Sequence, residues 1–173
     1  MACALTQNYT RDCLENFGGV KTVWLMELEN ADSITLTAGV VTTIDKAVGK
    51  VFRKYVLEAH VAEGSEDVAK SRESGTSAVK QSVKFPINKM TTSVRNELLL
   101  LGKNRLLIVL LDNNGKGWLY GYEFGCTLES AAIKTGVKLE DRNGYELTFV
   151  GNEKEPAYEV DSATLGTLET AGV

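Results

Sequence analysis

Residues 86–115 constrain the fold most, because they place the clearest helix pattern of the chain directly before its most apolar run. Four apolar residues recur at spacings that put them on one helical face: Met90, Val94, Leu98 and Leu101. Residues 106–111 are apolar without interruption, which is typical of a strand buried on both faces. We therefore expect one helix over residues about 90–101, lying beside a central buried strand.

Both ends of this helix carry local signals. Asn88 or Thr91 can cap the first turn, because a side-chain oxygen there accepts from an unpaired backbone N–H. Gly102 stands where helices commonly end in a residue of positive φ. Further on, residues 113–115, Asn-Asn-Gly, have the composition of a tight turn after the buried strand.

The rest of the chain is rich in strand patterns. β-branched and aromatic residues, or alternating polar and apolar residues, mark about nine strands; the clearest lie at 20–28, 34–37, 40–44, 52–61, 79–85, 106–111, 118–124, 129–135 and 145–150. We expect a mainly β fold, a β-sandwich or barrel with the single helix on its flank.

Residues 62–78 form a long polar connector between the alternating segments 52–61 and 79–85. The connector has almost no large apolar side chain, so it adds little to a monomer core. A connection of this length in a compact domain is usually functional or disordered. Two interpretations stay open: a flexible hairpin tip, or an arm that becomes ordered against a neighbouring subunit.

Length and charge limit the class of protein. The chain has 173 residues, which suits one domain with a real core. We expect a β-rich domain over 1–161 and a loose tail over 162–173, because the tail is small and polar. The net charge of -4 argues against a surface that grips nucleic acid. No run approaches the roughly 20 apolar residues of a membrane helix, and residues 1–13 show no secretory signal pattern.

Catalytic and metal-binding patterns are sparse. His60 is the single histidine and has no acidic or cysteine cluster at ligand spacing. The three cysteines, Cys3, Cys13 and Cys126, lack the spacing of a disulfide framework or zinc site, and we expect reduced thiols. Residues 112–115 and 141–144 share the pattern D-x-N-G, but neither has the further ligands of a calcium loop. We predict no catalytic, cofactor-binding or metal-binding residue and no cofactor; an unrecognised hydrolase is the weakest alternative.

Aromatic residues alternate through residues 118–124, with Trp118, Tyr120, Tyr122 and Phe124 on one expected face. Such a face is most often plain core or an intersubunit contact. It can also line the cavity of a small-ligand-binding β-barrel. This second class of function predicts a monomer with an internal cavity.

Two segments resemble structural proteins of tailed phages. One is D-R-N-G-Y-E-L-T-F-V-G-N-E-K-E-P-A-Y at 141–158, and the other is the opening at 3–25, where two cysteines precede G-G-V-K-T-V-W-L. The order of strands, polar hairpin, helix and further strands is similar to that of tail-tube subunits. The resemblance implies a non-enzymatic virion protein, made in the bacterial host cytoplasm, that forms hexameric rings stacked into a tube.

The resemblance also implies partners and a lumen. The partners are other copies of the chain, other virion proteins and DNA that passes through the channel without specific contacts; no membrane is involved. Segments 52–61 and 79–85 become the candidate lumen strands, with polar faces toward the channel. Lys54, Lys80 and Lys84 on those faces fit poorly with a uniformly repulsive bore. A head-tail connector, a tail-completion ring and a decoration protein remain alternatives.

Overall fold

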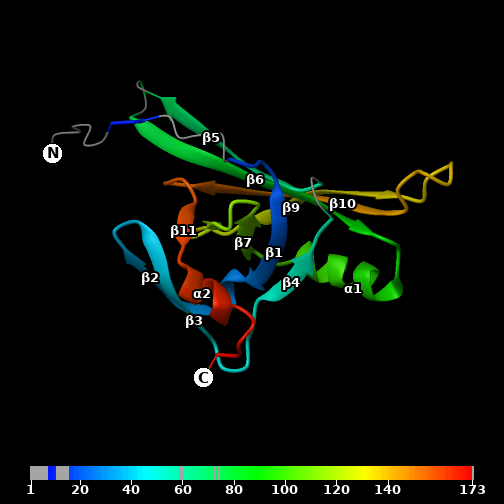
Figure 1. Ribbon diagram of the computed structural model, residues 1–173, viewed down its shortest axis with the longest axis horizontal. Helices are drawn as coiled ribbons and strands as arrows, with labels where there is room; N and C mark the ends of the chain where they lie inside the picture. The colour runs from blue at the N-terminus through cyan, green and yellow to red at the C-terminus, as the bar shows by residue number, and fades with distance from the viewer. Residues whose placement is uncertain (1–7, 11–15, 59–60, 72, 74, 173) are drawn as a thin grey trace.

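The computed structural model describes residues 8–10, 16–58, 61–71, 73 and 75–172. They form two β-sheets that pack face to face, as the sequence predicts for a sandwich (Figure 1). The larger sheet has seven strands in the order β2 (Ala31–Thr37), β3 (Val40–Lys46), β11 (Tyr158–Val160), β8 (Gly117–Tyr120), β7 (Leu106–Asp112), β1 (Val20–Glu27) and β4 (Arg53–Val56). The smaller has four strands in the order β5 (Glu63–Ser71), β6 (Thr76–Asn88), β10 (Gly144–Glu153) and β9 (Thr127–Lys134).

The structure also has three short helical segments: η1 (Leu28–Asn30), α1 (Thr92–Leu101) and, after the last strand, α2 (Ser162–Thr167). The expected mainly β fold is therefore confirmed, with eleven strands among the described residues and one main helix. None of the helices in the described part of the chain is long and apolar enough to cross a membrane.

The first core lies between the two sheets. Phe85 of β6 and Phe149 of β10 are fully buried there, and their rings stack with centroids 5.7 Å apart. β1 and β7 supply the opposite wall through residues such as Val23 and Ile108. Helix α1 covers one end of this core with Leu101, which is buried.

The second core lies on the other face of the seven-stranded sheet. Trp24, Leu107 and Val109 point into it from the central strands. The curled β2–β3 hairpin, Phe52 and the C-terminal segment close over it. Because β7 contributes to both cores, all residues from Leu106 to Leu110 are buried, and the unbroken apolar run is explained.

The expected helix is confirmed as α1, but it does not end in the way that the sequence predicts. Val94 N donates to Thr91 Oγ1 at 3.3 Å, so Thr91 is the cap. The prediction of positive φ at Gly102 is wrong, because its φ is -73°. The last turn instead tightens, with Gly102 N donating to Leu98 O at 3.0 Å and Lys103 N to Leu100 O at 3.1 Å.

The hairpin expected between segments 52–61 and 79–85 across the polar connector is wrong. Among the described residues 52–58 and 61, the one strand is β4, which pairs with β1 in the seven-stranded sheet. β6 instead pairs with β5, which begins inside the polar connector. The connector has no apolar pattern, yet it pairs with β6 along one side and so becomes an edge strand.

The aromatic residues at 118–124 do not share one face. β8 ends at Tyr120, and the chain turns at Gly121, whose φ is 75°. A Cβ at Gly121 would lie 2.8 Å from Leu106 O, so the close backbone approach requires glycine. Trp118 and Tyr120 therefore pack on the first core and Tyr122 on the second. The predicted single aromatic wall of a cavity is wrong.

The described part of the C-terminal segment packs against the fold, unlike the loose tail expected from its composition. Asp161 caps α2, with Thr164 N donating to its Oδ1 at 2.6 Å. Thr164 Oγ1 in turn donates to Thr42 O at 2.7 Å. Leu168 is fully buried in the second core. A few well-placed side chains are thus enough to fix a segment of small, polar composition.

Candidate functional site

The candidate site is the side of the four-stranded sheet that points away from the first core, here called the polar face. Along β6, Val79, Gln81, Val83 and Phe85 are buried, so the predicted alternation of 79–85 is confirmed. The strand registers extend the same alternation to β5, β9 and β10. The polar residues of this face are Glu63, Ser65, Asp67, Lys80, Ser82, Lys84, Ser130, Glu146, Thr148 and Asn152, and the registers place Pro86, Ala132 and Val150 on the same side.

Charges on the polar face lie opposite one another across strands. Lys84 Nζ and Glu146 Oε1 form an ion pair at 2.9 Å, and Glu63 lies beside Lys84 on the other strand. The hydrogen bond to Glu146 raises the pKa of Lys84, and the same bond lowers the pKa of Glu146. Asp67 faces Lys80 in the same manner. The lysines of this face are therefore matched by carboxylates.

Lys54 does not belong to the polar face. It lies on β4 of the other sheet, where its Nζ pairs with Glu169 Oε1 at 2.8 Å. The same ammonium group stands 5.5 Å from the centroid of the Trp24 ring. The expectation that Lys54 shares a face with Lys80 and Lys84 is thus wrong.

The far ends of β5 and β6 continue beyond the sandwich as a two-stranded ribbon (Figure 1). Ala69 pairs with Ala78 and Lys70 with Ser77, and all four are exposed. Residues 69–78, here called the polar ribbon, include positions 72 and 74, which lie outside the described residues. All described residues of this ribbon are exposed, so they add little to the stability of their own domain.

The edges of the four-stranded sheet are its outermost strands, β5 and β9. Among the described residues, β5 pairs only with β6 and β9 only with β10. Because all pairings are antiparallel and the sheet has four strands, its two edge strands run in opposite directions. Each edge offers backbone groups that can pair with another strand.

The two edges are also staggered along the strand direction. Asp67, at the centre of β5, lies opposite Lys80. Ala131, near the centre of β9, is level with Phe85 through its pairing with Leu147. Phe85 lies five residues beyond Lys80 on β6, so the sheet is a slanted rather than a rectangular ribbon.

The remaining sequence candidates have structural roles or lie elsewhere. Asp112 Oδ1 accepts from the backbone N–H groups of Asn114 and Lys116, at 2.9 and 2.8 Å, as expected for a turn. Cys126 is buried, and burial raises the pKa of its thiol to about 12. His60, Cys3 and Cys13 lie outside the described residues. Within the described ranges, no group of three or more His, Cys, Asp or Glu side chains could hold a metal ion.

A buried polar network, which the sequence does not signal, ties the two sheets together. Gln81 points into the core, where its Oε1 accepts from Gly121 N at 2.9 Å and its Nε2 donates to Glu66 Oε1 at 2.9 Å. The Glu153 carboxylate accepts from the backbone N–H groups of residues 123, 124 and 125 at 2.9–3.2 Å. These bonds hold the turn after β8 in place.

Comparisons of the chain with protein-family models, with curated proteins and with solved structures give no match.

Proposed function

We propose that the protein is a non-enzymatic structural subunit of a phage virion, specifically a tail-tube protein that assembles as hexameric rings. The rings stack to form a channel through which DNA passes. The proposal starts from the resemblance of residues 3–25 and 141–158 to tailed-phage structural proteins. The observation that carries it furthest is the four-stranded sheet with two open, staggered edges and a polar face.

The edges suit closure into a barrel. When copies are related by rotation about a common axis, β9 of one copy runs antiparallel to β5 of the next, because the edge strands of each sheet are oppositely directed. A closed barrel requires tilted strands and a stagger between them. The slant of the sheet supplies a stagger of this kind. Pairing of β9 with β5 would remove both edges of every copy.

The polar face suits the inside of such a barrel. The other face is covered by the first core, so the polar face would line the lumen. Small polar side chains and matched charges, such as Lys84 with Glu146, leave few cations to hold DNA phosphates. This arrangement removes the conflict that Lys80 and Lys84 raise in the sequence, because each lies opposite a carboxylate.

Negative-stain electron microscopy of the purified protein across a concentration series, with light scattering alongside, tests the proposal. We expect rings or tubes with a central hole at high concentration. A connector or tail-completion ring gives single rings that do not stack. Compact monomers at every concentration would contradict the proposal.

A variant with a shortened polar ribbon tests whether this part of the β5 edge is needed for assembly. Replacing residues 70–77 with Asn-Gly joins the paired residues Ala69 and Ala78 through a two-residue hairpin. The described residues removed are all exposed, so the monomer should keep its circular dichroism spectrum and melting temperature. We expect the variant to lose rings or tubes, since part of the β5 edge is gone.

A further inference from the structure

The two edge strands of the four-stranded sheet are nearly equal in length, which limits how they can pair. β5 has nine residues and β9 has eight. If β9 of one copy lies antiparallel to β5 of the next, all of β9 finds residues of β5 opposite it in two registers only. Lys134 lies opposite Glu63 in the first register and opposite Gly64 in the second.

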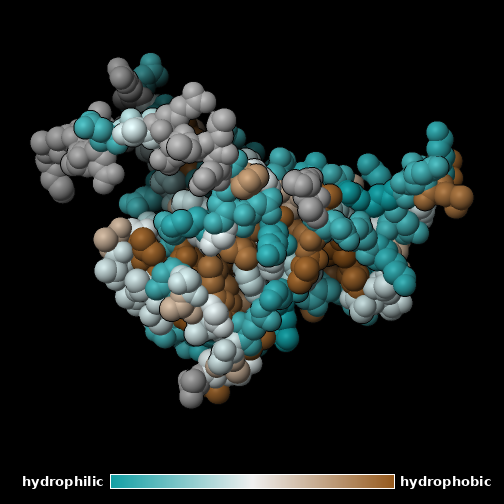
Figure 2. Space-filling view, viewed as in Figure 1, coloured by the Kyte–Doolittle hydropathy of each residue, from teal (hydrophilic) through white to brown (hydrophobic). Residues whose placement is uncertain are grey.

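The two faces of the sheet select the first register. Ile133 pairs with Tyr145, which is buried in the first core, so the next residue, Lys134, points to the polar face. Glu63 also lies on the polar face, whereas Gly64 pairs with the buried Val83. In Figure 2, hydrophilic side chains run along most of the four-stranded sheet and hydrophobic ones lie beneath them. Pairing of Lys134 with Glu63 continues both faces from copy to copy.

The first register also gives a closed barrel an ordinary strand tilt. Lys134 is level with Asn88 of β6 through Gly144, and Glu63 is level with Lys84. The strands of successive copies are therefore displaced by four residues, the separation of Asn88 and Lys84. Four residues rise about 14 Å, and four strands are about 19 Å wide. The resulting tilt of about 35° is at the lower end of the usual range of about 35–45°.

On the core side, this register brings an exposed isoleucine next to a glycine. The Ile133 side chain is 53% exposed, although it points toward the first core. Gly64 lies opposite it in the neighbouring copy. A Cβ at Gly64 would lie 2.5 Å from Leu110 Cδ1 and 2.7 Å from the Tyr120 hydroxyl oxygen, so β5 has no room for a side chain here. A strand added next to β5 can supply the apolar side chain that β5 lacks.

The space for this side chain is a pocket of about 460 Å³ between the two sheets. Gly64, Leu110 and Tyr120 line it, and an inward side chain on a strand beside β5 enters it at Gly64. Ala131 comes opposite Glu66, whose carboxylate accepts from Gln81 Nε2 at 2.9 Å and from Ala157 N at 2.7 Å. A small side chain at position 131 leaves these two hydrogen bonds intact.

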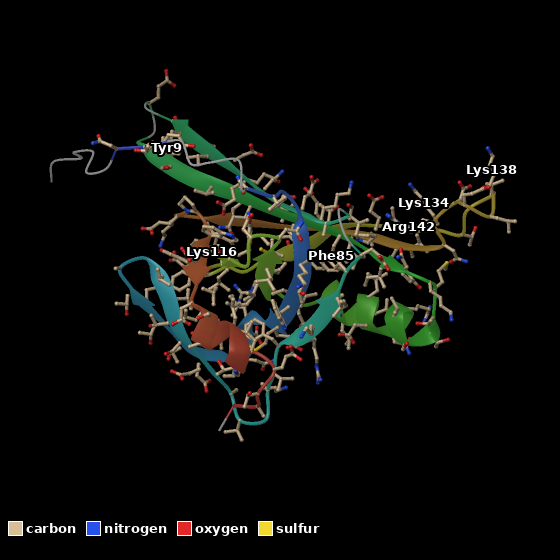
Figure 3. All side chains as sticks on the ribbon, in the orientation of Figure 1. Tyr9, Phe85, Lys116, Lys134, Lys138 and Arg142 are labelled. Atoms are coloured by element: carbon tan, nitrogen blue, oxygen red, sulfur yellow. The ribbon has the colours of Figure 1, made fainter. Side chains whose placement is uncertain are left out.

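On the polar face, the same register pairs a cation with a carboxylate. Figure 3 shows Lys134 on the part of the sheet that extends past Phe85, away from the centre of the molecule. Glu63 lies beside Lys84, whose Nζ is already paired with Glu146. The Glu63 carboxylate can therefore accept from Lys134 of the neighbouring copy.

We propose that β9 of one copy adds to β5 of the next with Lys134 opposite Glu63, so that Ile133 covers Gly64 and closes the gap between the sheets. The inference rests on the proposed function, because it takes neighbouring copies in a ring as its frame. The contact uses two different surfaces and can repeat around a closed ring. The register shift of β9 against β10 lies between Ser130 and Leu128, so it does not affect the end of β9 at Lys134.

Single-cysteine variants on the polar face test the register, in a background with Cys3→Ser and Cys13→Ser. Ala132→Cys and Ser65→Cys come directly opposite each other, and both positions are exposed in one copy. Residues opposite each other on antiparallel strands have Cα atoms about 4.5–5.5 Å apart, which a disulfide can span. We expect a disulfide-linked dimer on mild oxidation only when the two variants are mixed. Asp67→Cys, two residues further along β5, replaces Ser65→Cys in the matched control and should give none.

The outcomes separate this inference from the proposed function. Rings in the micrographs without the disulfide between positions 132 and 65 would overturn the inference and leave the function standing. The disulfide in open chains without rings would support the inference and contradict the function. A disulfide between positions 132 and 67 instead would mean a shifted register and overturn the inference. Linkage of Ala132→Cys to itself would also overturn it, because the contact would be symmetric.

The contact at Gly64 can be tested without a cross-link. Ile133→Ser should weaken self-association by about fivefold or more in light scattering, because an aliphatic side chain no longer becomes buried between copies. Leu139→Ser is the matched control, since Leu139 is exposed in the loop that follows β9 and lies outside the paired residues. The melting temperatures of both dilute variants check that each is folded. If Ile133→Ser associates as strongly as Leu139→Ser, the inference is wrong.

Discussion

The two sheets differ in how completely the single chain uses them. The centre of the seven-stranded sheet is buried on both faces, and β7 contributes side chains to both cores. The four-stranded sheet buries one face, leaves the other mostly polar, and continues into a ribbon whose described residues are exposed. Burial on two faces explains the fold of one copy. The exposed face and the edges of the smaller sheet add little to the stability of one copy. For this reason they are the candidate surfaces for assembly between copies.

The largest expected difference between the sheets is in the cost of removing a side chain. Leu107→Ala in β7 should lower the free energy of unfolding by about 2–5 kcal/mol, because Leu107 is fully buried and leaves a cavity. Thr148→Ala on the polar face should change it by less than about 1 kcal/mol. Urea denaturation of dilute, monomeric protein measures both. Equal losses would remove the distinction between the two regions.

The buried polar network should give the next largest effect. Glu153→Gln places an amide NH₂ group where the carboxylate accepts from three backbone N–H groups. Loss of these charge-assisted bonds should destabilise the protein by about 1–3 kcal/mol in the same denaturation assay. Glu129→Gln on the exposed part of β9 is the matched control and should be nearly neutral. A neutral Glu153→Gln would mean that the network does not tie the sheets together.

The cap of α1 should have a smaller effect. Thr91→Ala removes the oxygen that accepts from Val94 N and should cost about 1 kcal/mol. Because α1 covers one end of the first core, this loss of stability reports on the packed face of the four-stranded sheet and not on its polar face. Thr91→Ser keeps an accepting hydroxyl and should retain most of the stability. Thermal unfolding followed by circular dichroism compares the two variants.

The smallest expected effect is a pH-dependent change in amide exchange in the loop between β9 and β10, residues 135–143. The pKa of Asp141 is lowered by bonds from Lys138 N and Val137 N. A lowered folded-state pKa means that the contribution is present above the ordinary aspartate pKa of about 4. It is lost as the pH falls through the lowered value. Amide exchange of Val137 and Lys138 should accelerate in Asp141→Asn at neutral pH, with the difference from wild type disappearing in acid. A difference that grows in acid would contradict this sign.

Elements with strong local patterns could be predicted from the sequence. The buried run of β7 and the apolar face of α1 follow from periodicity, and both were placed nearly at their observed positions. The alternation of β6 likewise gave the two faces of the candidate site. Such signals depend on neighbouring residues, which is why they survive without knowledge of the fold.

Elements that depend on distant partners could not be predicted from the sequence. β5 has no apolar pattern and is a strand only because β6 pairs with it. β4 alternates well but joins the other sheet, because β1 is its partner. The pairing of Gly144 with Asn88, and hence the slant of the sheet, arises from contacts between segments far apart in the chain.

Hydrogen–deuterium exchange of the edge strands, in monomer and in assembled protein, tests the central claim most directly. The claim is that β9 of one copy pairs with β5 of the next. It predicts that amides of Glu63–Ser71 and Thr127–Lys134 that exchange quickly in the monomer become protected on assembly. Amides of the outer edge strand β2 should keep their monomer rates. Assemblies in which β5 and β9 exchange as fast as in the monomer would contradict the account.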